Sequence, residues 1–189
     1  MLLSIVVPVY NEEENIANFY KAVTDVMSGL TYDYELIFVD DGSSDSSAMI
    51  LREIAFNDKH VKVLLLARNF GHQTALTCGL DYAHGDAVIT MDGDMQHPPA
   101  LIPELVRLWE SGYDVVRTIR DSTDDASWAK SFTSKYYYKL MNKMADVPIV
   151  EGGSDFRLMN SKALGTLKRF REHGRFLRGI VGALGYRQA

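Results

Sequence analysis

Apolar and polar positions alternate with two different periodicities along the first 120 residues. Short runs rich in Val and Ile predict strands, and apolar residues spaced three or four apart predict helices between them. We expect strands at 5–9, 35–39, 61–66, 87–91 and 114–118. We expect helices at 12–28, through 49–54, at 74–83 and at 100–111. This order predicts an α/β fold with a mainly parallel central sheet and helices on both faces.

The first of these helices has a well-defined predicted start. Asn11 is the expected cap, and the three glutamates that follow it suit the positive end of a helix dipole. Beyond residue 120 the strand pattern stops, and we expect no further strand. The expected elements there are a polar loop at 121–125, a long helix at 126–145, a glycine turn at 152–153 and helices at 162–169 and 175–184.

Composition narrows the class of protein. The chain has 189 residues, of which 47% are hydrophobic, so we expect one folded domain over 1–189. With 20 basic and 25 acidic residues the net charge is -5, which argues against nucleic acid as a partner. Cys78 is the single cysteine, so a reduced, cytoplasmic compartment is expected. No stretch approaches the roughly 18 to 20 apolar residues that cross a bilayer, and no signal peptide is recognisable at the start.

Polar residues follow each of the five predicted strands. They are Tyr10 to Glu12, Asp40 to Ser43, Arg68 and Asn69, Asp92 to Asp94, and Arg117. In an open parallel sheet, ligands bind beyond the carboxyl ends of the strands. Any single polar end is explained equally well by a solvated loop. Five polar ends together favour a binding site at this edge of the sheet.

Asp92 and Asp94 form the most specific part of this pattern. Two residues apart on an extended segment, their side chains leave the same side of the backbone. Carboxylate oxygens select hard cations, so the pair predicts a site for Mg²⁺ or Mn²⁺, to which Gln96 could add an amide oxygen. A simple turn is the alternative for an Asp-x-Asp match. The preceding apolar strand and the following Pro98 and Pro99 favour the metal site.

The loop after the second strand offers another carboxylate. Asp40 directly follows a buried-looking Val39 and could accept hydrogen bonds from a ribose or a base, whereas Ser44 and Asp45 are expected to cap the next helix. Neither G-x-G-x-x-G after the first strand nor a P-loop sequence occurs. A bound diphosphate would therefore be held by metal and arginine.

Several segments together resemble one enzyme family. They are Ile5 to Glu12, Val39 to Asp45, Arg68 to Gly71, Gly85 and Asp86, Met91 to Pro99, and Asp155 to Leu158. In order and spacing they resemble the inverting glycosyltransferases of family two, which have the GT-A fold. The resemblance is to the branch that glycosylates polyprenyl phosphates, the dolichol-phosphate mannose synthase-like enzymes.

The resemblance implies a role for each matching residue. Pro8, Tyr10, Glu12 and Asp40 would line the nucleotide pocket. Asp92 would face ribose and diphosphate, while Asp94 and Gln96 would hold the metal together with it. Arg117 would meet the diphosphate, and Asp155 falls where the family places an acceptor-side carboxylate, usually described as the base. An acceptor phosphate is already ionised at pH 7 and needs no base, so the alternative for Asp155 is to orient the acceptor or its cations. For Asp155, an ion pair with Arg157 or with a nearby arginine is the structural alternative.

The resemblance also implies the substrates and the place of action. A nucleotide sugar, with UDP-glucose as the expected donor, would pass its sugar to undecaprenyl phosphate. The nucleotide-sugar part would be 1–120 and the acceptor part 121–189. Such enzymes usually continue with a basic segment and hydrophobic helices, so we expect a truncated catalytic domain or a need for a partner. We expect the protein at the inner face of the cell membrane. Whether it forms a homo-oligomer stays an open question.

The predicted helix at 126–145 is compatible with two locations. An apolar stripe runs beside a row of lysines, Lys135, Lys139 and Lys143. It could lie at a membrane interface with its lysines at lipid phosphates, or pack on the sheet with its lysines in water. Among the histidines, His72, His97 and His173 lack metal-ligand spacing and are expected in solvent or at helix caps.

Three other functions stay open. Transfer to a saccharide hydroxyl would require Asp155 as a base. A nucleotidyltransferase would need a glycine-rich phosphate loop where Glu12 to Glu14 stand. A sugar-nucleotide sensor would keep the pocket without turnover.

Overall fold

The computed structural model describes residues 1–119, 153–170 and 177–189. Their strands form one sheet in the order β3-β2-β1-β4-β6-β5. The strands are β1 (Leu2–Val9), β2 (Asp33–Asp40), β3 (Val61–Leu65), β4 (Ala87–Thr90), β5 (Val115–Ile119) and β6 (Gly153–Asn160). The helices are α1 (Ile16–Ser28), α2 (Ser47–Asn57), α3 (His72–Tyr82), η1 (Pro99–Leu101), α4 (Ile102–Glu110), α6 (Ser161–Leu167) and α7 (Leu177–Ala183).

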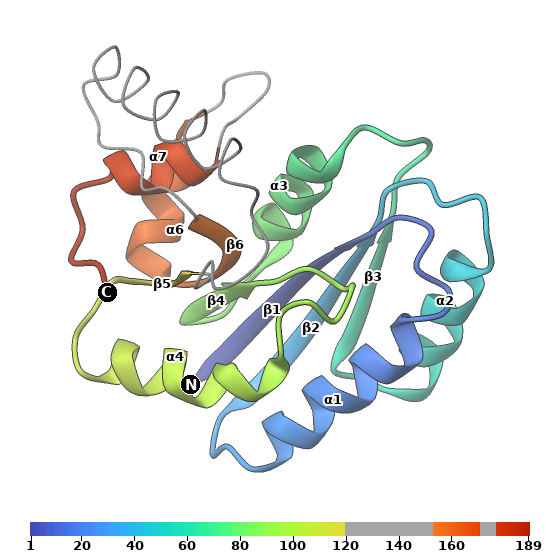
Figure 1. Ribbon diagram of the computed structural model, residues 1–189, viewed down its shortest axis with the longest axis horizontal. Coiled ribbons are helices and arrows are strands. Elements are labelled where there is room, and N and C mark those ends of the chain that lie inside the picture. The colour runs from blue at the N-terminus through green and yellow to red at the C-terminus, as the bar shows by residue number, and fades with distance from the viewer. Residues whose placement is uncertain (120–152, 171–176) are drawn as a thin grey trace, which may run out of the picture.

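Helices cover both faces of the sheet, as the sequence pattern predicts. α1, α2 and α4 lie along one face, and α3, α6 and α7 lie along the other (Figure 1). Because β1 is sandwiched between these layers, Leu3, Ile5 and Val7 pack toward the first group, while Val6 packs toward the second. A strand that is buried on both faces has a continuous run of apolar residues, and this makes the parallel strands recognisable from the sequence.

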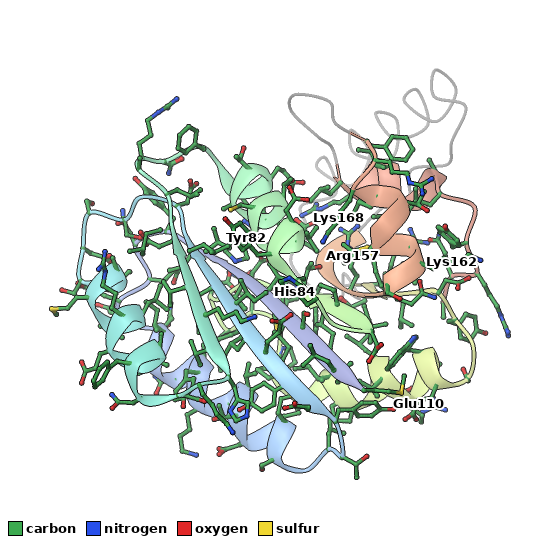
Figure 2. All side chains as sticks on the ribbon, turned by 180° about the vertical axis from the view of Figure 1, so that it is seen from behind. Tyr82, His84, Glu110, Arg157, Lys162 and Lys168 are labelled. Carbon is green, nitrogen blue, oxygen red and sulfur yellow. The ribbon has the colours of Figure 1, made fainter. Side chains whose placement is uncertain are left out.

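The expectation that no strand follows residue 120 is wrong. β6 lies between β4 and β5 and runs antiparallel to both. Phe156 and Leu158 face the first layer, but Asp155 and Arg157 interrupt the apolar pattern. Both charged residues are nevertheless buried, because they form an ion pair with each other. Figure 2 shows Arg157 between α3 and α6.

The expected cap of the first helix is also wrong. α1 begins at Ile16, and Asn11 has a positive φ of 54°. The Asn11 side chain accepts the N–H of Ser44 at 2.8 Å, and Glu13 accepts that of Ser46 at 2.8 Å. These bonds join the loops that follow β1 and β2, so the polar residues serve a long-range contact instead of a local helix start.

Several expectations concern residues outside the described ranges. These are the loop at 121–125, the helix at 126–145 with its lysine row, Gly152 of the glycine turn at 152–153, His173 and the first two residues of the helix at 175–184. The two last predicted helices otherwise correspond to α6 and α7. Among the described helices, none combines the length and apolar character that spanning a bilayer requires.

A close approach of α3 to the sheet depends on Gly79. A Cβ there would lie 2.3 Å from Cγ1 of Val6 and 2.9 Å from Cγ2 of Val39. We expect Gly79→Ala to lower the free energy of unfolding by about 1–3 kcal/mol in a urea titration, because overpacking outweighs the gain in helix propensity. Gly165→Ala in α6, where no atom lies within 4 Å of the added Cβ, is the control and should be neutral or stabilising. Equal effects would contradict the packing argument.

Glu35 supports the opposite end of the sheet from the strand ends discussed below. Its buried carboxylate accepts hydrogen bonds from Ser4, Lys62 and the N–H of His84. Burial alone would raise the pKa of Glu35, but these three donors outweigh it and hold the pKa below its ordinary value of 4.5. The carboxylate therefore stabilises the fold above that value, and the contribution is lost as pH falls through the lowered pKa.

We expect Glu35→Gln to lower the free energy of unfolding at pH 7 by about 1–3 kcal/mol. The difference from the unmodified protein should shrink as the pH falls below about 4.5. Urea titrations at several pH values measure both. A difference that stays constant with pH would contradict this account of the carboxylate.

Candidate active site

A hollow of about 460 Å³ lies at the carboxyl ends of β1, β2 and β4. The last residues of β1, the segments after β1, β2 and β4, and residues of α3, β6 and α7 line it. Its lining comprises Pro8, Val9, Tyr10, Glu12, Asp41, Asn69, His72, Gln73, Ala75, Asp92, Gly93, Asp94, Asp155 and Arg178. This is the edge at which an open parallel sheet is expected to bind ligands.

The loop before α3 is held in place by the loop after β2. The buried Asp41 carboxylate accepts the N–H groups of Phe70 and Gly71, each at 2.8 Å. Gly42 adjoins this pair, and a Cβ on it would lie 2.4 Å from the carbonyl carbon of Arg68. The two residues together fix where α3 begins, and hence where His72 lies in the hollow.

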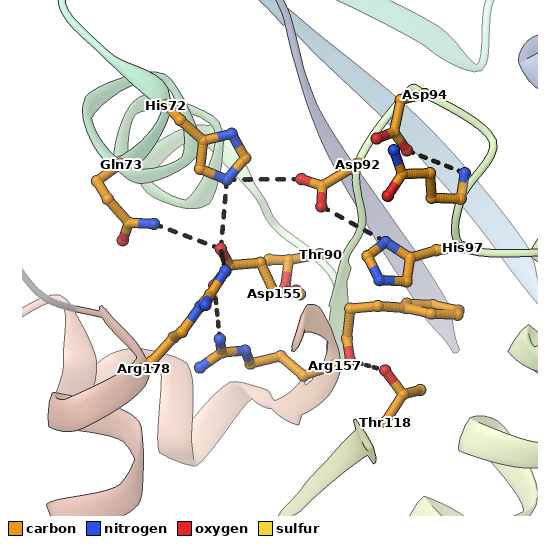
Figure 3. A network of polar contacts seen from close by, with 12 residues as sticks. His72, Gln73, Thr90, Asp92, Asp94, His97, Thr118, Asp155, Arg157 and Arg178 are labelled. Atoms are coloured by element: carbon orange, nitrogen blue, oxygen red, sulfur yellow. Dashed lines mark hydrogen bonds and ion pairs between the residues drawn. The ribbon is translucent and has the colours of Figure 1, made fainter. Parts of the chain in front are cut away.

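Asp92 lies between two histidines. Its Oδ1 is 3.5 Å from Nε2 of His72, and its Oδ2 is 3.4 Å from Nδ1 of His97 (Figure 3). Burial raises the pKa of Asp92, the nearby charges of Asp155 and Asp94 add to this, and the histidines partly offset it. A carboxylate with a raised pKa among other acids is a favourable place for a cation.

Asp155 has the most hydrogen-bond donors of these carboxylates. Its Oδ1 accepts from Nη2 of Arg157 at 2.7 Å and from Nε of Arg178 at 3.0 Å. Its Oδ2 accepts from Nη2 of Arg178 at 2.7 Å, with Gln73 Nε2 and His72 Nε2 each 3.4 Å away. Burial alone would raise the pKa of Asp155, but the bonds from His72 and Arg178 and the charge of Arg157 outweigh it. Its pKa is therefore well below the usual range.

The structure brings together most of the residues that the sequence singled out. The six that line the hollow are Pro8, Tyr10, Glu12, Asp92, Asp94 and Asp155. Asp40, Gln96 and Arg117 are not in its lining. The ion pair of Asp155 with Arg157, the structural alternative, is present.

Of the three residues outside the lining, Asp40 and Gln96 lie within two residues of lining positions in the chain, and Arg117 does not. Asp40 is buried, and its Oδ2 accepts the N–H of Ser43 at 3.3 Å. Gln96 donates its backbone N–H to Asp94 at 3.0 Å. Arg117 lies on β5 directly opposite Arg157 of β6. The roles that the resemblance implies for these three stay predictions.

The expectation of a solvent or capping role is wrong for His97, whereas His72 does lie at the start of α3 with its side chain 43% exposed. His72 contacts Asp92 and Asp155 inside the hollow, and His97 is buried beside Asp92 with its ring 5.6 Å from that of Phe156. The signal was available for His72, because it closes the polar segment after the third strand. The bond from Asp155 is the main cause of the raised pKa of His72.

Sequence reasoning also gave no site role to Asp41, Gln73 or Arg178. In the sequence Asp41 is one of several polar residues of the loop after the second strand, and nothing there distinguishes it from its neighbour Asp40. Arg178 comes from the last described helix, α7, which has no strand end to indicate it. Its position in the hollow follows from tertiary packing alone.

The carboxylates fit a divalent cation that binds together with a substrate. No group of three or more His, Cys, Asp and Glu side chains suited to a metal occurs in the described part of the chain. Asp92 and Asp94 nevertheless share the hollow, and Oδ1 of Asp92 is buried without a hydrogen-bond partner. Mg²⁺ is commonly bound through one or two carboxylates, with substrate phosphates and water completing its coordination.

Comparison with known proteins gives one consistent result. The family profile described as Glycosyl transferase family 2 matches residues 4–167. An uncharacterized glycosyltransferase of Synechocystis, sll0501, is 42% identical over 98% of this chain and 58% of its own length. Bactoprenol glucosyl transferase of Shigella phage SfV is 40% identical over 98% of this chain and 60% of its own length. The chain thus spans less than two thirds of these relatives.

Solved structures agree on the fold. The mannosyltransferase PcManGT from Pyrobaculum calidifontis, in complex with GDP-Man and Mn²⁺, has a TM-score of 0.62 at 20% identity, over 98% of this chain and 53% of that one. Glucosyl-3-phosphoglycerate synthase from Mycobacterium tuberculosis, with Mn²⁺ and UDP, has a TM-score of 0.59 at 23% identity, over 86% of this chain and 56% of that one. The expected GT-A architecture is confirmed.

Proposed function

Because this chain belongs to glycosyl transferase family 2, we propose that it transfers glucose from UDP-glucose to undecaprenyl phosphate at a membrane surface. The observation that carries this proposal is the 40% identity to bactoprenol glucosyl transferase over 98% of the chain. Bactoprenol is a bacterial polyprenol, so the name of that relative indicates both the sugar and the class of acceptor. The proposed place of action is the inner face of the cell membrane.

The donor end of the hollow is proposed to be the carboxylate end. Asp92, Asp94 and Gln96 are the residues that would hold Mg²⁺ or Mn²⁺, and two structural neighbours that were solved with Mn²⁺ support a divalent ion. When bound, such an ion neutralises negative charge that develops on the departing diphosphate. We propose that Arg117 adds a second positive charge, and that Pro8, Tyr10, Glu12 and Asp40 contact the nucleotide.

The proposed reaction is a single displacement at the anomeric carbon. An oxygen of the acceptor phosphate forms the new bond from one face while the bond to the diphosphate oxygen breaks on the opposite face, so the configuration inverts. A phosphate monoester has its second pKa near 6 and is already largely ionised at pH 7. No group of the protein then needs to remove a proton from the acceptor.

Transfer to a defined lipid tests this proposal. The full chain is incubated with UDP-glucose, undecaprenyl phosphate in detergent micelles, and either Mg²⁺ or Mn²⁺. We expect UDP release that depends on both lipid and metal, and a glucosyl phosphate lipid of β configuration by NMR. UDP release without a lipid product would contradict the acceptor, and retained α configuration would contradict the displacement. A preference for a GDP-sugar would contradict the donor.

A further inference from the structure

The Asp155 carboxylate is saturated with donors. Two arginines donate three hydrogen bonds of 2.7 to 3.0 Å to it, and Gln73 and His72 lie 3.4 Å from the same Oδ2. The side chain is only 2% exposed. A general base must reach the proton that it removes, within hydrogen-bond distance of the substrate. Neither oxygen of Asp155 presents an open position to a hydroxyl group in the hollow.

Arg178 differs from Asp155 in its access to the hollow. Its side chain is 46% exposed, whereas the other arginine on Asp155, Arg157, is 4% exposed. The bidentate pair uses Nε and Nη2, which fixes the plane of the guanidinium. An arginine fixed in this way is well suited to bind phosphate, because little side-chain freedom remains to be lost.

The charges of the hollow are separated along its length. Figure 3 shows Asp94 on one side of Asp92 and Arg178 on the other side. His72 and Asp155 lie on the same side of Asp92 as Arg178. Among the lining residues in the described part of the chain, Arg178 is the one arginine or lysine. An anion that avoids the carboxylates is therefore attracted to the Arg178 end.

From this arrangement we propose that Asp155 is a positioning residue, not a base, and that it holds Arg178 where the guanidinium binds a phosphate group of a substrate. The inference rests on the proposed function for the reaction itself. We assign the phosphate to the acceptor, because the donor diphosphate is expected at Asp92 and Asp94. A contact to the donor diphosphate is the other source of the same chemistry, and kinetics with each substrate separates the two.

Three variants test the proposal: Arg178→Gln, Asp155→Asn and the double variant. Steady-state kinetics are measured separately with undecaprenyl phosphate and with UDP-glucose. A hydrogen bond to a charged group contributes about 1.5–3 kcal/mol, which corresponds to roughly 10- to 150-fold in KM. We expect Arg178→Gln to raise KM for the lipid phosphate by that factor, with KM for UDP-glucose within about threefold of the original.

The double variant separates positioning from base catalysis. If Asp155 acts through Arg178, Asp155→Asn alone should raise KM for the lipid by a similar factor. Introduced into the Arg178→Gln variant, it should raise that KM by less than about threefold more. If Asp155 is the base, Asp155→Asn should lower kcat at least about 100-fold with or without Arg178, and should abolish the acid limb of the pH profile of kcat. That second result would overturn the proposal.

Two further measurements keep the test decisive. Asp155→Asn removes the buried partner of Arg157 and could unfold the protein, so UDP binding is measured by calorimetry to establish whether each variant is folded. Arg178→Gln leaves the buried pair of Asp155 and Arg157 intact. If Asp155→Asn does not fold, the KM values of Arg178→Gln alone test whether Arg178 binds the phosphate. Arg107→Gln is the matched control, since Arg107 is paired with Glu104 on the surface of α4. Arg178→Gln with an unchanged KM for lipid overturns the inference, and so does a rise confined to UDP-glucose. Absence of transfer by the unmodified chain contradicts the proposed function instead.

Discussion

Asp94→Asn is expected to lower the rate of sugar transfer by about 100- to 1,000-fold. The substitution keeps the shape of the side chain but removes its negative charge, and with it much of the affinity for a divalent cation. Loss of one group that stabilises developing charge typically costs this much. Initial rates with UDP-glucose and undecaprenyl phosphate, measured over a range of Mn²⁺ concentrations, give the effect. We expect part of the loss to be recovered at high Mn²⁺.

A binding measurement separates the cation from other causes of inactivity. UDP with Mn²⁺ should raise the melting temperature of the unmodified protein, since a ligand that binds only the folded state stabilises it. The rise should be much smaller for Asp94→Asn. Asp25→Asn, which removes an exposed carboxylate of α1 paired with Lys21, is the control and should leave rate and melting shift unchanged. Full activity of Asp94→Asn would refute the metal role.

The fold was predictable wherever burial produces a simple pattern. β1 carries an almost unbroken apolar run and β2 carries one at 36–39, because α1 and α3 cover these strands from opposite sides. β6 escaped prediction because its apolar residues alternate with Asp155 and Arg157. Burial of two such charges is tolerable only when they are paired. The pair of Asp155 with Arg157 is local, but the further donors to Asp155 from α3 and α7 cannot be identified from a short stretch of sequence.

The site was predictable to the extent that it lies at the ends of parallel strands. This rule correctly located Asp92 and Asp94 in one hollow. It gave no reason to choose Asp41 over Asp40, because the choice depends on which carboxylate meets the N–H groups of Phe70 and Gly71. It could not find Arg178 at all, since α7 reaches the hollow only through its packing over the sheet.

Gly42→Ala is expected to have the largest effect on stability, with a loss of about 2–4 kcal/mol in the free energy of unfolding. The added Cβ would lie 2.4 Å from the carbonyl carbon of Arg68 and 2.8 Å from the nitrogen of Asn69. These are backbone atoms, so no side-chain rotation relieves the clash and the loop before α3 must move. Because that loop leads into His72, we expect UDP binding to weaken at least about tenfold in the folded variant.

A second glycine separates this clash from backbone strain. Gly42 has a φ of +69°, which an alanine adopts at a cost of about 1–2 kcal/mol whatever surrounds it. Gly185 has the same φ of +69° but no atom within 4 Å of an added Cβ. Gly185→Ala should therefore lose only about 1–2 kcal/mol and leave UDP binding unchanged. Urea titration and calorimetry of both variants measure the difference. Equal losses would mean that strain alone acts at Gly42, and that its packing against Arg68 does not hold the loop.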